Sequence, residues 1–127
     1  MSELKIVIWT AVAFSLWHVP VMTMNTEDAV PAPQIPVLLT NAVVIGAIWG
    51  MLRLISGSII VTSVCHAVWN AAVYVFFGYG TTTGALGVRQ TALYGPESGY
   101  LGLGLNLVLA IAVMQWWKRR RANTPLP

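Results

Sequence analysis

The feature that most constrains this chain is a series of four apolar runs, each about as long as a lipid bilayer is thick. The runs cover residues 6–24, 37–54, 59–77 and 99–117. An α-helix needs about 20 apolar residues to cross the hydrocarbon core of a bilayer. Only 9% of the residues are charged, compared with about 25% in soluble domains. The sequence therefore predicts an all-α membrane protein, a bundle of about four transmembrane helices that forms a single domain over residues 1–127.

The charged residues predict how this bundle is oriented. Lys5, Arg53 and the basic C-terminal segment 118–127 fall on one side of the predicted spans, and Glu27 and Asp28 fall on the other. Cytoplasmic segments of membrane proteins are enriched in Lys and Arg. We therefore expect both termini to be cytoplasmic, with a basic tail after the last span, in a bacterial-type inner (cytoplasmic) membrane. The basic segment is interpreted as an anchor at the lipid headgroups, not as a nucleic-acid site.

Both histidines of the chain lie inside predicted spans. His66 and Asn70 are four residues apart, so their side chains project from the same face of a helix, and His18 lies in the first run. Polar groups in a membrane are costly unless they are paired or used. One interpretation is a hydrogen bond between helices, worth about 0.6–2 kcal/mol. The other is a functional site, because neutral imidazole is a common ligand of zinc and related metals.

Two histidines are one ligand short of a catalytic zinc site, which has three protein ligands and an open position for water. A carboxylate would complete the set and could also act as a base. With the rise of an α-helix, the predicted helix boundaries place His18 and His66 about 8 Å apart in depth. The sequence therefore leaves open whether the two side chains meet.

Several other positions carry local predictions. Pro20 removes a backbone donor and should kink or end the first helix near His18. Gly46 and Gly50 form a G-x-x-x-G pair, which is typical of closely packed helices. Asn41 is expected to bond across a helix interface or to cap a helix. Residues 78–95 are too polar to span a membrane and long for a plain connection, so we expect them to be partly ordered against the bundle.

Taken together, these motifs resemble a known family. The pairs Phe14-x-x-x-His18 and His66-x-x-x-Asn70 flank a glycine-containing helix and turn, residues 46–58. In this order and spacing they are similar to the CPBP family of intramembrane metalloproteases, which includes the type II CAAX prenyl endopeptidases and the bacterial Abi proteins. The resemblance covers residues 6–117, and the order of the motifs is more specific than any one of them.

The resemblance implies an activity and a site. It implies hydrolysis of a membrane-associated protein or peptide, with His18, His66 and Asn70 as catalytic residues. His18 and His66 would also bind a divalent metal, zinc in the first place. Asn70 would stabilise the oxyanion of a tetrahedral intermediate, and Phe14 would be a packing residue. Membrane lipid, the protein or peptide substrate and another membrane chain are the partners that this implies.

The chain departs from the family pattern at one motif. The family carries Glu-Glu-x-x-x-Arg upstream of Phe-x-x-x-His, and its glutamate is the general base. The carboxylates of this chain are Glu3, Glu27, Asp28 and Glu97, and none of them fits that motif. We therefore expect a truncated or inactive relative, with little or no proteolysis by this chain alone. The alternatives are a non-catalytic membrane protein of the same fold, with an immunity or interaction role, and a haem-binding or transport bundle.

Overall fold

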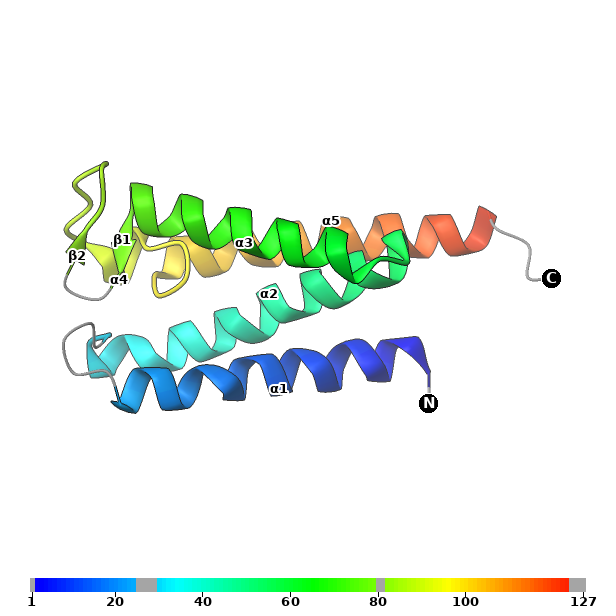
Figure 1. The fold of residues 1–127 in the computed structure, drawn as a ribbon, viewed down its shortest axis with the longest axis horizontal. Coiled ribbons are helices and arrows are strands. Elements are labelled where there is room, and N and C mark those ends of the chain that lie inside the picture. Colours follow the sequence, from blue (N-terminus) through cyan, green and yellow to red (C-terminus); the bar gives the residue numbers. More distant parts are fainter. Residues whose placement is uncertain (1, 25–29, 80–81, 124–127) are drawn as a thin grey trace.

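A computed structural model of the chain describes residues 2–24, 30–79 and 82–123. Four long helices lie along its long axis, and the shorter elements gather at one end (Figure 1). The long helices are α1 (Glu3–Met24), α2 (Ile35–Ser56), α3 (Ile59–Phe76) and α5 (Tyr100–Asn123). The short elements are the 3₁₀-helix η1 (Ala32–Gln34), the strands β1 (Gly78–Tyr79) and β2 (Thr82–Thr83), and the one-turn helix α4 (Thr91–Tyr94). The predicted all-α fold class is confirmed.

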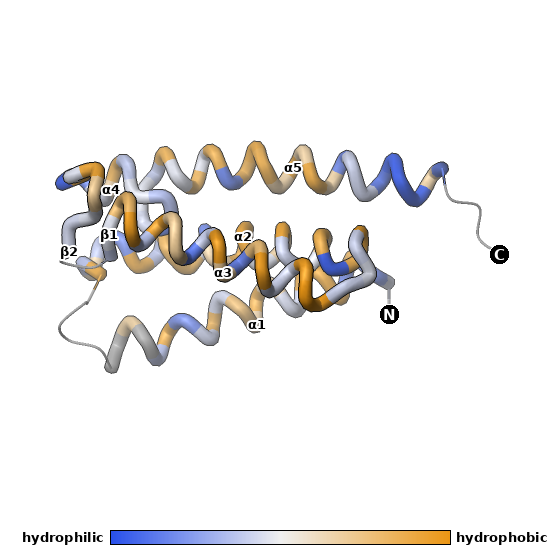
Figure 2. Tube along the Cα trace, turned by 45° about the horizontal axis from the view of Figure 1, so that its top comes forward, coloured by the Kyte–Doolittle hydropathy of each residue, from blue (hydrophilic) through white to orange (hydrophobic). Residues whose placement is uncertain are grey.

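Three helices among the described residues are long and apolar enough to cross a membrane. They cover Ala32–Ser56, Ile59–Phe76 and Tyr100–Asn123. The hydropathy-coloured tube in Figure 2 shows apolar residues along these helices and a hydrophilic C-terminal end of α5. The first predicted span, residues 6–24, falls within α1, a helix of 22 residues. Its crossing of the membrane stays a prediction.

The first helix continues through Pro20. Of the two predicted effects, a kink or an end near His18, the end does not occur, because α1 continues to Met24 with the proline inside it. Membrane helices tolerate an internal proline because neighbouring groups satisfy the freed carbonyl. The basic cluster at residues 118–121 is part of a helix, since α5 is helical up to Asn123. The cations there lie beside the tryptophans, with the Arg121 guanidinium 5.4 Å from the centre of the Trp117 ring.

The two ends of the chain lie at the same end of the bundle (Figure 1). Glu3 and Arg121 form an ion pair at 2.9 Å, which joins the start of α1 to the end of α5. Arg120 also donates to the backbone oxygen of Ile55 at the end of α2. The cationic ends therefore share one side, as predicted, and their cytoplasmic location stays a prediction. Glu27 and Asp28 lie outside the described residues.

Helix α2 is the centre of the bundle, with contacts to α1, α5 and α3. Its glycines allow α1 to approach closely: a Cβ on Gly46 would lie 3.0 Å from the backbone Cα of Ala11. The predicted role of the G-x-x-x-G pair in close packing is confirmed by this contact and by the position of Gly50 against Val7. The buried apolar cluster contains Val7 of α1, Ile48 and Met51 of α2, and Val113 and Trp117 of α5.

A two-residue turn reverses the chain between α2 and α3. Gly57 has a φ of +66°, a conformation that glycine adopts without a steric penalty, and it ends α2. Ser58 then caps α3, because its hydroxyl accepts a hydrogen bond from the Val61 N–H at 3.4 Å. This turn sends α3 back along α2 and brings residue 66 alongside the middle of that helix.

Between α3 and α5 the described residues, 77–79 and 82–99, lie against the bundle, as the sequence predicted for part of this segment, and they include a strand pair that it did not predict. Strands β1 and β2 pair antiparallel, with Gly78 opposite Thr83 and Tyr79 opposite Thr82. The chain then returns to α3, where the Ala85 N–H donates to the Val75 oxygen. It passes through α4 and a tight turn before α5 begins. That turn contains Glu97.

Candidate active site

His18 is held in one orientation by its own helix. Its Nδ1–H donates to the carbonyl oxygen of Phe14, one turn earlier in α1, at 2.7 Å. The Phe-x-x-x-His spacing produces this contact, because residues i and i+4 lie above one another on a helix. The bond assigns the proton to Nδ1, so a neutral His18 keeps the lone pair of Nε2 for a substrate, a water or a metal.

Phe14 packs against both histidines. Its ring centre lies 4.8 Å from that of His18 and 5.3 Å from that of His66, both in edge-on arrangements. The ring centre of Trp49, from α2, lies 5.8 Å from that of His66. Phe14 is in turn placed by Gly46, whose missing Cβ would lie 3.1 Å from the ring atom Cδ1. The phenylalanine of the first motif therefore joins the two histidine-bearing helices.

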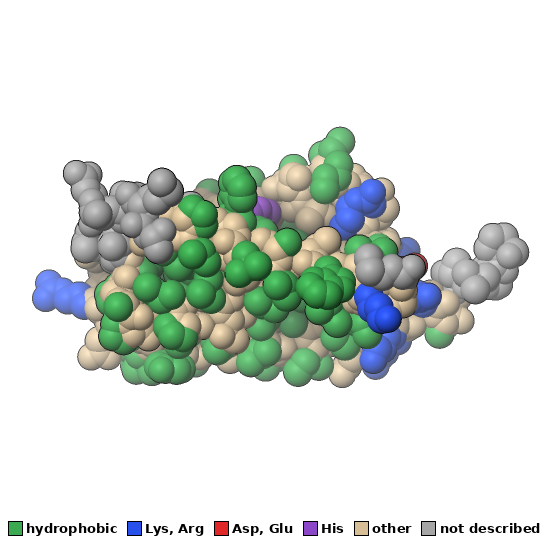
Figure 3. Space-filling model, turned by 90° about the horizontal axis from the view of Figure 1, so that it is seen from below, with side chains coloured by type: hydrophobic (Ala, Val, Ile, Leu, Met, Phe, Trp, Pro, Cys, Tyr) green, Lys and Arg blue, Asp and Glu red, His purple; other side chains and the backbone are tan. Residues whose placement is uncertain are grey.

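The three predicted site residues line one cavity of about 420 Å³. His18 comes from α1, and His66 and Asn70 come from one face of α3. A smaller adjoining cavity is lined by the same three residues together with Leu38, Ala42 and Ile45 of α2. The depth difference estimated from the sequence does not keep the histidines apart. In Figure 3 a histidine is visible between hydrophobic side chains, in a recess of the surface.

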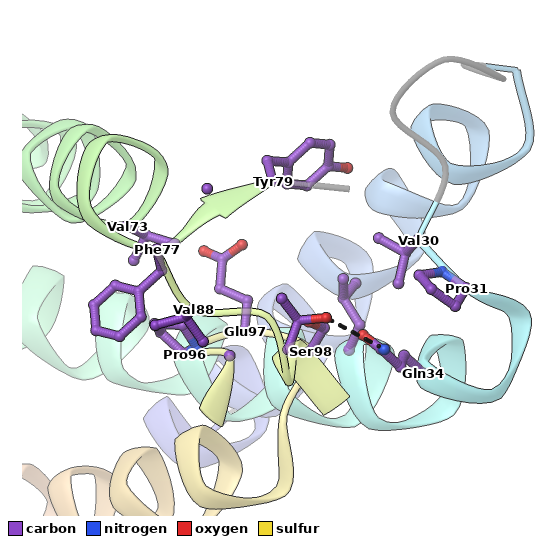
Figure 4. Close-up of a pocket in the computed structure, with 14 residues that line it drawn as sticks. Val30, Pro31, Gln34, Val73, Phe77, Tyr79, Val88, Pro96, Glu97 and Ser98 are labelled. Carbon is purple, nitrogen blue, oxygen red and sulfur yellow. Dashed lines mark hydrogen bonds between the residues drawn. The ribbon is translucent and has the colours of Figure 1, made fainter. Parts of the chain in front are cut away.

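Glu97 also lines both of these cavities, and it was not among the predicted site residues. Its carboxylate Oε1 accepts a hydrogen bond from the indole N–H of Trp69 at 2.9 Å. Trp69 lies between His66 and Asn70 on α3. Figure 4 shows the Glu97 side chain extending from the turn before α5 toward β1 and Tyr79. A carboxylate from a connecting segment therefore lines the same cavities as the histidine and asparagine side chains of the spans.

Two buried asparagines hold the backbone around Glu97. The side-chain amide of Asn41, on α2, donates to the carbonyl oxygens of Pro96 and Glu97 at 2.8 and 2.9 Å. The amide of Asn106, on α5, donates to the Pro96 oxygen and to Asn41 Oδ1, both at 3.0 Å. Asn41 is fully buried, and Asn106 nearly so. The prediction that Asn41 bonds across a helix interface is confirmed.

The sequence contained a partial signal for Glu97. It is the only carboxylate after residue 28, and it directly precedes the last apolar run. Asn106 is a second polar residue inside that run. Its hydrogen bond to Asn41, and those of Asn41 to the turn at Pro96, could not be predicted from the sequence, because these partners are 55 to 65 positions apart and meet only through packing of α2 on α5.

The predicted metal, bound by His18 and His66, stays a prediction. In the part of the chain that the structure describes, no three His, Cys, Asp or Glu side chains come together as a metal-binding group. Glu97 shares the cavity with both histidines but does not complete such a set. Because a catalytic zinc needs three protein ligands, these residues do not fit a zinc centre, and no chemical step is derived through a metal.

The fold and the cavity define a class, a helical membrane protein with histidine, asparagine and glutamate side chains gathered inside the bundle. A family model described as type II CAAX prenyl endopeptidase Rce1-like matches residues 1–72. The chain belongs to this family and is a CAAX-protease-like membrane protein. No curated protein and no solved structure gives a match. The family match includes His18, His66 and Asn70 but ends before the turn that carries Glu97.

Proposed function

We propose that the cavity between α1 and α3 is a hydrolytic site that cuts a peptide bond in a membrane-associated protein or peptide. The observation that carries this proposal is that His18, His66 and Asn70 line one cavity although they come from two different helices. Polar side chains inside a membrane bundle are costly, so their convergence favours a use in binding or chemistry. The family's description makes a prenylated C-terminal peptide the first substrate to test.

The three side chains supply complementary groups for such a reaction. The Nε2 lone pair of His18 is available to accept a hydrogen bond, because its Nδ1–H is used by the Phe14 oxygen. The amide of Asn70 is a donor of the kind that stabilises a developing oxyanion. His66, whose ring packs against those of Phe14 and Trp49, would hold the substrate carbonyl or a water. The edge-on aromatic contacts restrict the orientation of both imidazoles.

An apolar cavity beside the site suits a prenyl chain. It has a volume of about 640 Å³ and lies between α3 and α5. Its walls include Phe76 at the end of α3, Phe77 directly after it, and Leu101 and Leu105 from α5. Trp69 lines both this cavity and the smaller cavity of the histidines. This volume lies within the range of about 300–1,000 Å³ that is typical of small-molecule sites. A substrate with its lipid between the helices would present its peptide near Trp69.

The same proposal includes a location. With both termini in the cytoplasm, the ion pair between Glu3 and Arg121 lies at the cytoplasmic end of the bundle. The inner membrane of a bacterium fits this orientation and the predicted basic anchor. Accessibility of cysteines introduced at residue 2 and at residue 89 to a membrane-impermeant thiol reagent tests it, with reaction expected only at residue 89 in intact cells.

Cleavage of a prenylated, internally quenched CAAX peptide by the purified chain in bicelles tests the activity. We expect His66→Ala and Asn70→Ala to lower kcat/KM by about 100-fold or more, as loss of a positioning group or of an oxyanion donor does. Val68→Ala is the matched control, because Val68 lies on the same helix with 62% of its surface exposed. Cleavage of the same peptide without the prenyl group tests whether the apolar cavity contributes to substrate binding. Equal cleavage by the wild type and His66→Ala would refute the proposal.

One observation favours a second candidate, a non-catalytic member of the same family. The 127 residues contain no Glu-Glu-x-x-x-Arg motif, which was the reason to expect little proteolysis. Such a protein would bind the prenylated peptide without cutting it. Binding of the peptide to the wild type in the absence of any cleavage, with binding lost on filling the apolar cavity by Leu105→Trp, would favour this candidate.

A further inference from the structure

We propose that Glu97 is the general base of this site, the carboxylate that takes a proton from the attacking water. This inference rests on the proposed hydrolytic function and adds to it a residue from outside the matched family region. Glu97 lines the same cavity as His18, His66 and Asn70. A general base has to lie within reach of the water it activates, and this geometry is the first requirement.

The backbone at Glu97 is fixed by contacts that a mere connecting loop does not need. The side-chain amide of Asn41 donates to the Pro96 and Glu97 carbonyls, and that of Asn106 donates to the Pro96 carbonyl. Gly102 of α5 fits against the same segment, since a Cβ there would overlap the carbonyl oxygens of Gly95 and Pro96. Two helices, α2 and α5, thus hold this turn. A reacting group needs such rigid support to stay in a productive geometry.

The side chain of Glu97 is oriented as well. The indole of Trp69 donates to Oε1, and Trp69 lies one residue before Asn70 on α3. This bond uses Oε1, and Oε2 is the carboxylate oxygen that we assign to the attacking water. Other described groups at this cavity that carry titratable protons are His18, His66, Tyr74 and Tyr79. Glu97 is the carboxylate among them.

The other acidic residues offer no competitor inside the described structure. Glu3 is paired with Arg121 at the opposite end of the bundle, where the termini lie. Its side chain is substantially exposed to solvent there. Glu97 is half-buried beside the histidines. Glu3 therefore belongs to a surface ion pair, whereas Glu97 belongs to the cavity.

The proposed step is a balanced hydrolysis. Glu97 Oε2 accepts one proton of the water, the water oxygen forms a bond to the scissile carbonyl carbon, and the carbonyl π electrons move to its oxygen. Asn70 donates a hydrogen bond to that oxyanion. The C–N bond then breaks with its electron pair on nitrogen, and Glu97 returns the proton to this leaving amine. The products are a carboxylic acid and an amine, and Glu97 ends as the carboxylate.

Glu97→Gln, in the full chain in bicelles with the prenylated CAAX peptide, tests the assignment. Glutamine keeps the size of the side chain and an oxygen that accepts from Trp69, so the fold should be unchanged in a thermal melt. We expect kcat to fall by about 10²–10⁴-fold, the range for loss of a general base, with KM within about threefold. Glu97→Asp, which keeps a carboxylate, should recover part of kcat. Glu3→Gln is the matched control and should leave kcat unchanged.

Each outcome supports or overturns the assignment. A large loss in kcat in Glu97→Gln, with an unchanged melt and partial recovery in Glu97→Asp, supports it. Full activity of Glu97→Gln beside an inactive His66→Ala overturns it and leaves the hydrolytic function standing. A loss that appears in KM or in the melting temperature overturns it in favour of a structural role. An inactive wild type overturns the hydrolytic function and the general base together.

Discussion

Helices α2 and α3 are neighbours in sequence and nearly equal in hydropathy, yet they differ in how much of each is buried inside the protein. Their most apolar windows have mean hydropathies of 2.0 and 1.7. Of these windows, 44% is buried inside the protein for α2 but only 6% for α3. In a membrane protein, hydropathy therefore identifies a span without telling whether its side chains face protein or lipid. Which side chains of a span are buried depends on how the helices pack against one another.

The difference shows in how each helix uses its polar residues. On α2, Asn41 is fully buried and bonds to the turn before α5. On α3, His66 and Asn70 are partly accessible and line a cavity. The asparagine of α2 serves assembly, whereas the polar face of α3 serves the proposed chemistry. Substitutions on the two helices should therefore separate stability from activity.

The largest difference is expected from truncating an apolar side chain on each helix. Met51 of α2 is 1% exposed and Val68 of α3 is 62% exposed. Met51→Ala should lower the free energy of unfolding by about 2–5 kcal/mol, because it leaves a cavity. Val68→Ala should change it by less than about 0.5 kcal/mol. Unfolding by SDS titration from a mild detergent measures both, and equal losses would contradict the contrast between the helices.

The asparagines provide the next test. Asn41→Leu removes the donors for two backbone carbonyls and the partner of Asn106, and should cost about 1–3 kcal/mol of unfolding free energy. Asn70→Leu should cost less than half of this while abolishing peptide cleavage. The same SDS titration, run beside the cleavage assay, separates the two. A neutral Asn41→Leu would mean that the buried amide does not stabilise the turn.

The glycine pair of α2 tests how closely α1 is packed. Gly46→Ala places a methyl group 3.0 Å from the backbone of Ala11 and against Phe14, and should destabilise the fold by about 1–2 kcal/mol. In Gly50→Ala the new methyl group meets Val7 at 3.4 Å, an ordinary contact. That change should be neutral or stabilise by up to about 1 kcal/mol. Thermal melts of the two variants compare them, and the reverse order would contradict the packing described.

The smallest effect is expected at the start of α3. Ser58→Ala removes the side-chain acceptor for the Val61 N–H and should lower the free energy of unfolding by about 0.5–1 kcal/mol, the low end for a helix cap. Ser63→Ala, at an exposed position of the same helix, is the matched control and should be neutral. A loss at Ser58 as large as that at Met51 would show that α3 contributes more to stability than its exposure indicates.

Much of the candidate site was predictable because its spacing is local. The four-residue intervals from Phe14 to His18 and from His66 to Asn70 place each pair on one helix face, whatever the rest of the fold does. The hydrogen bond from His18 to the Phe14 carbonyl is a direct product of that spacing. The convergence of His18 with His66 was not predictable, because helical rise alone left them at different depths.

Glu97 escaped prediction for a different reason. It belongs to no periodic pattern, and it lies between the segment predicted to be partly ordered, residues 78–95, and the last apolar run, residues 99–117. Its place in the cavity depends on Asn41 and Asn106, two residues whose sequence separation from each other is 65 positions. No local propensity encodes such a contact. It exists because α2 packs against both α1 and α5, which brings their polar residues to one end of the bundle.

The sequence by itself determined the helices of this protein, because apolar runs of bilayer length leave the backbone no other way to satisfy its hydrogen bonds in lipid. It also determined the motifs that mark the CAAX endopeptidase family. Only the tertiary structure decided that α2 is far more buried than α3, and that the Glu97 side chain lines the same cavity as the two histidines. These results depend on side-chain packing between distant segments, which hydropathy and helical periodicity do not encode.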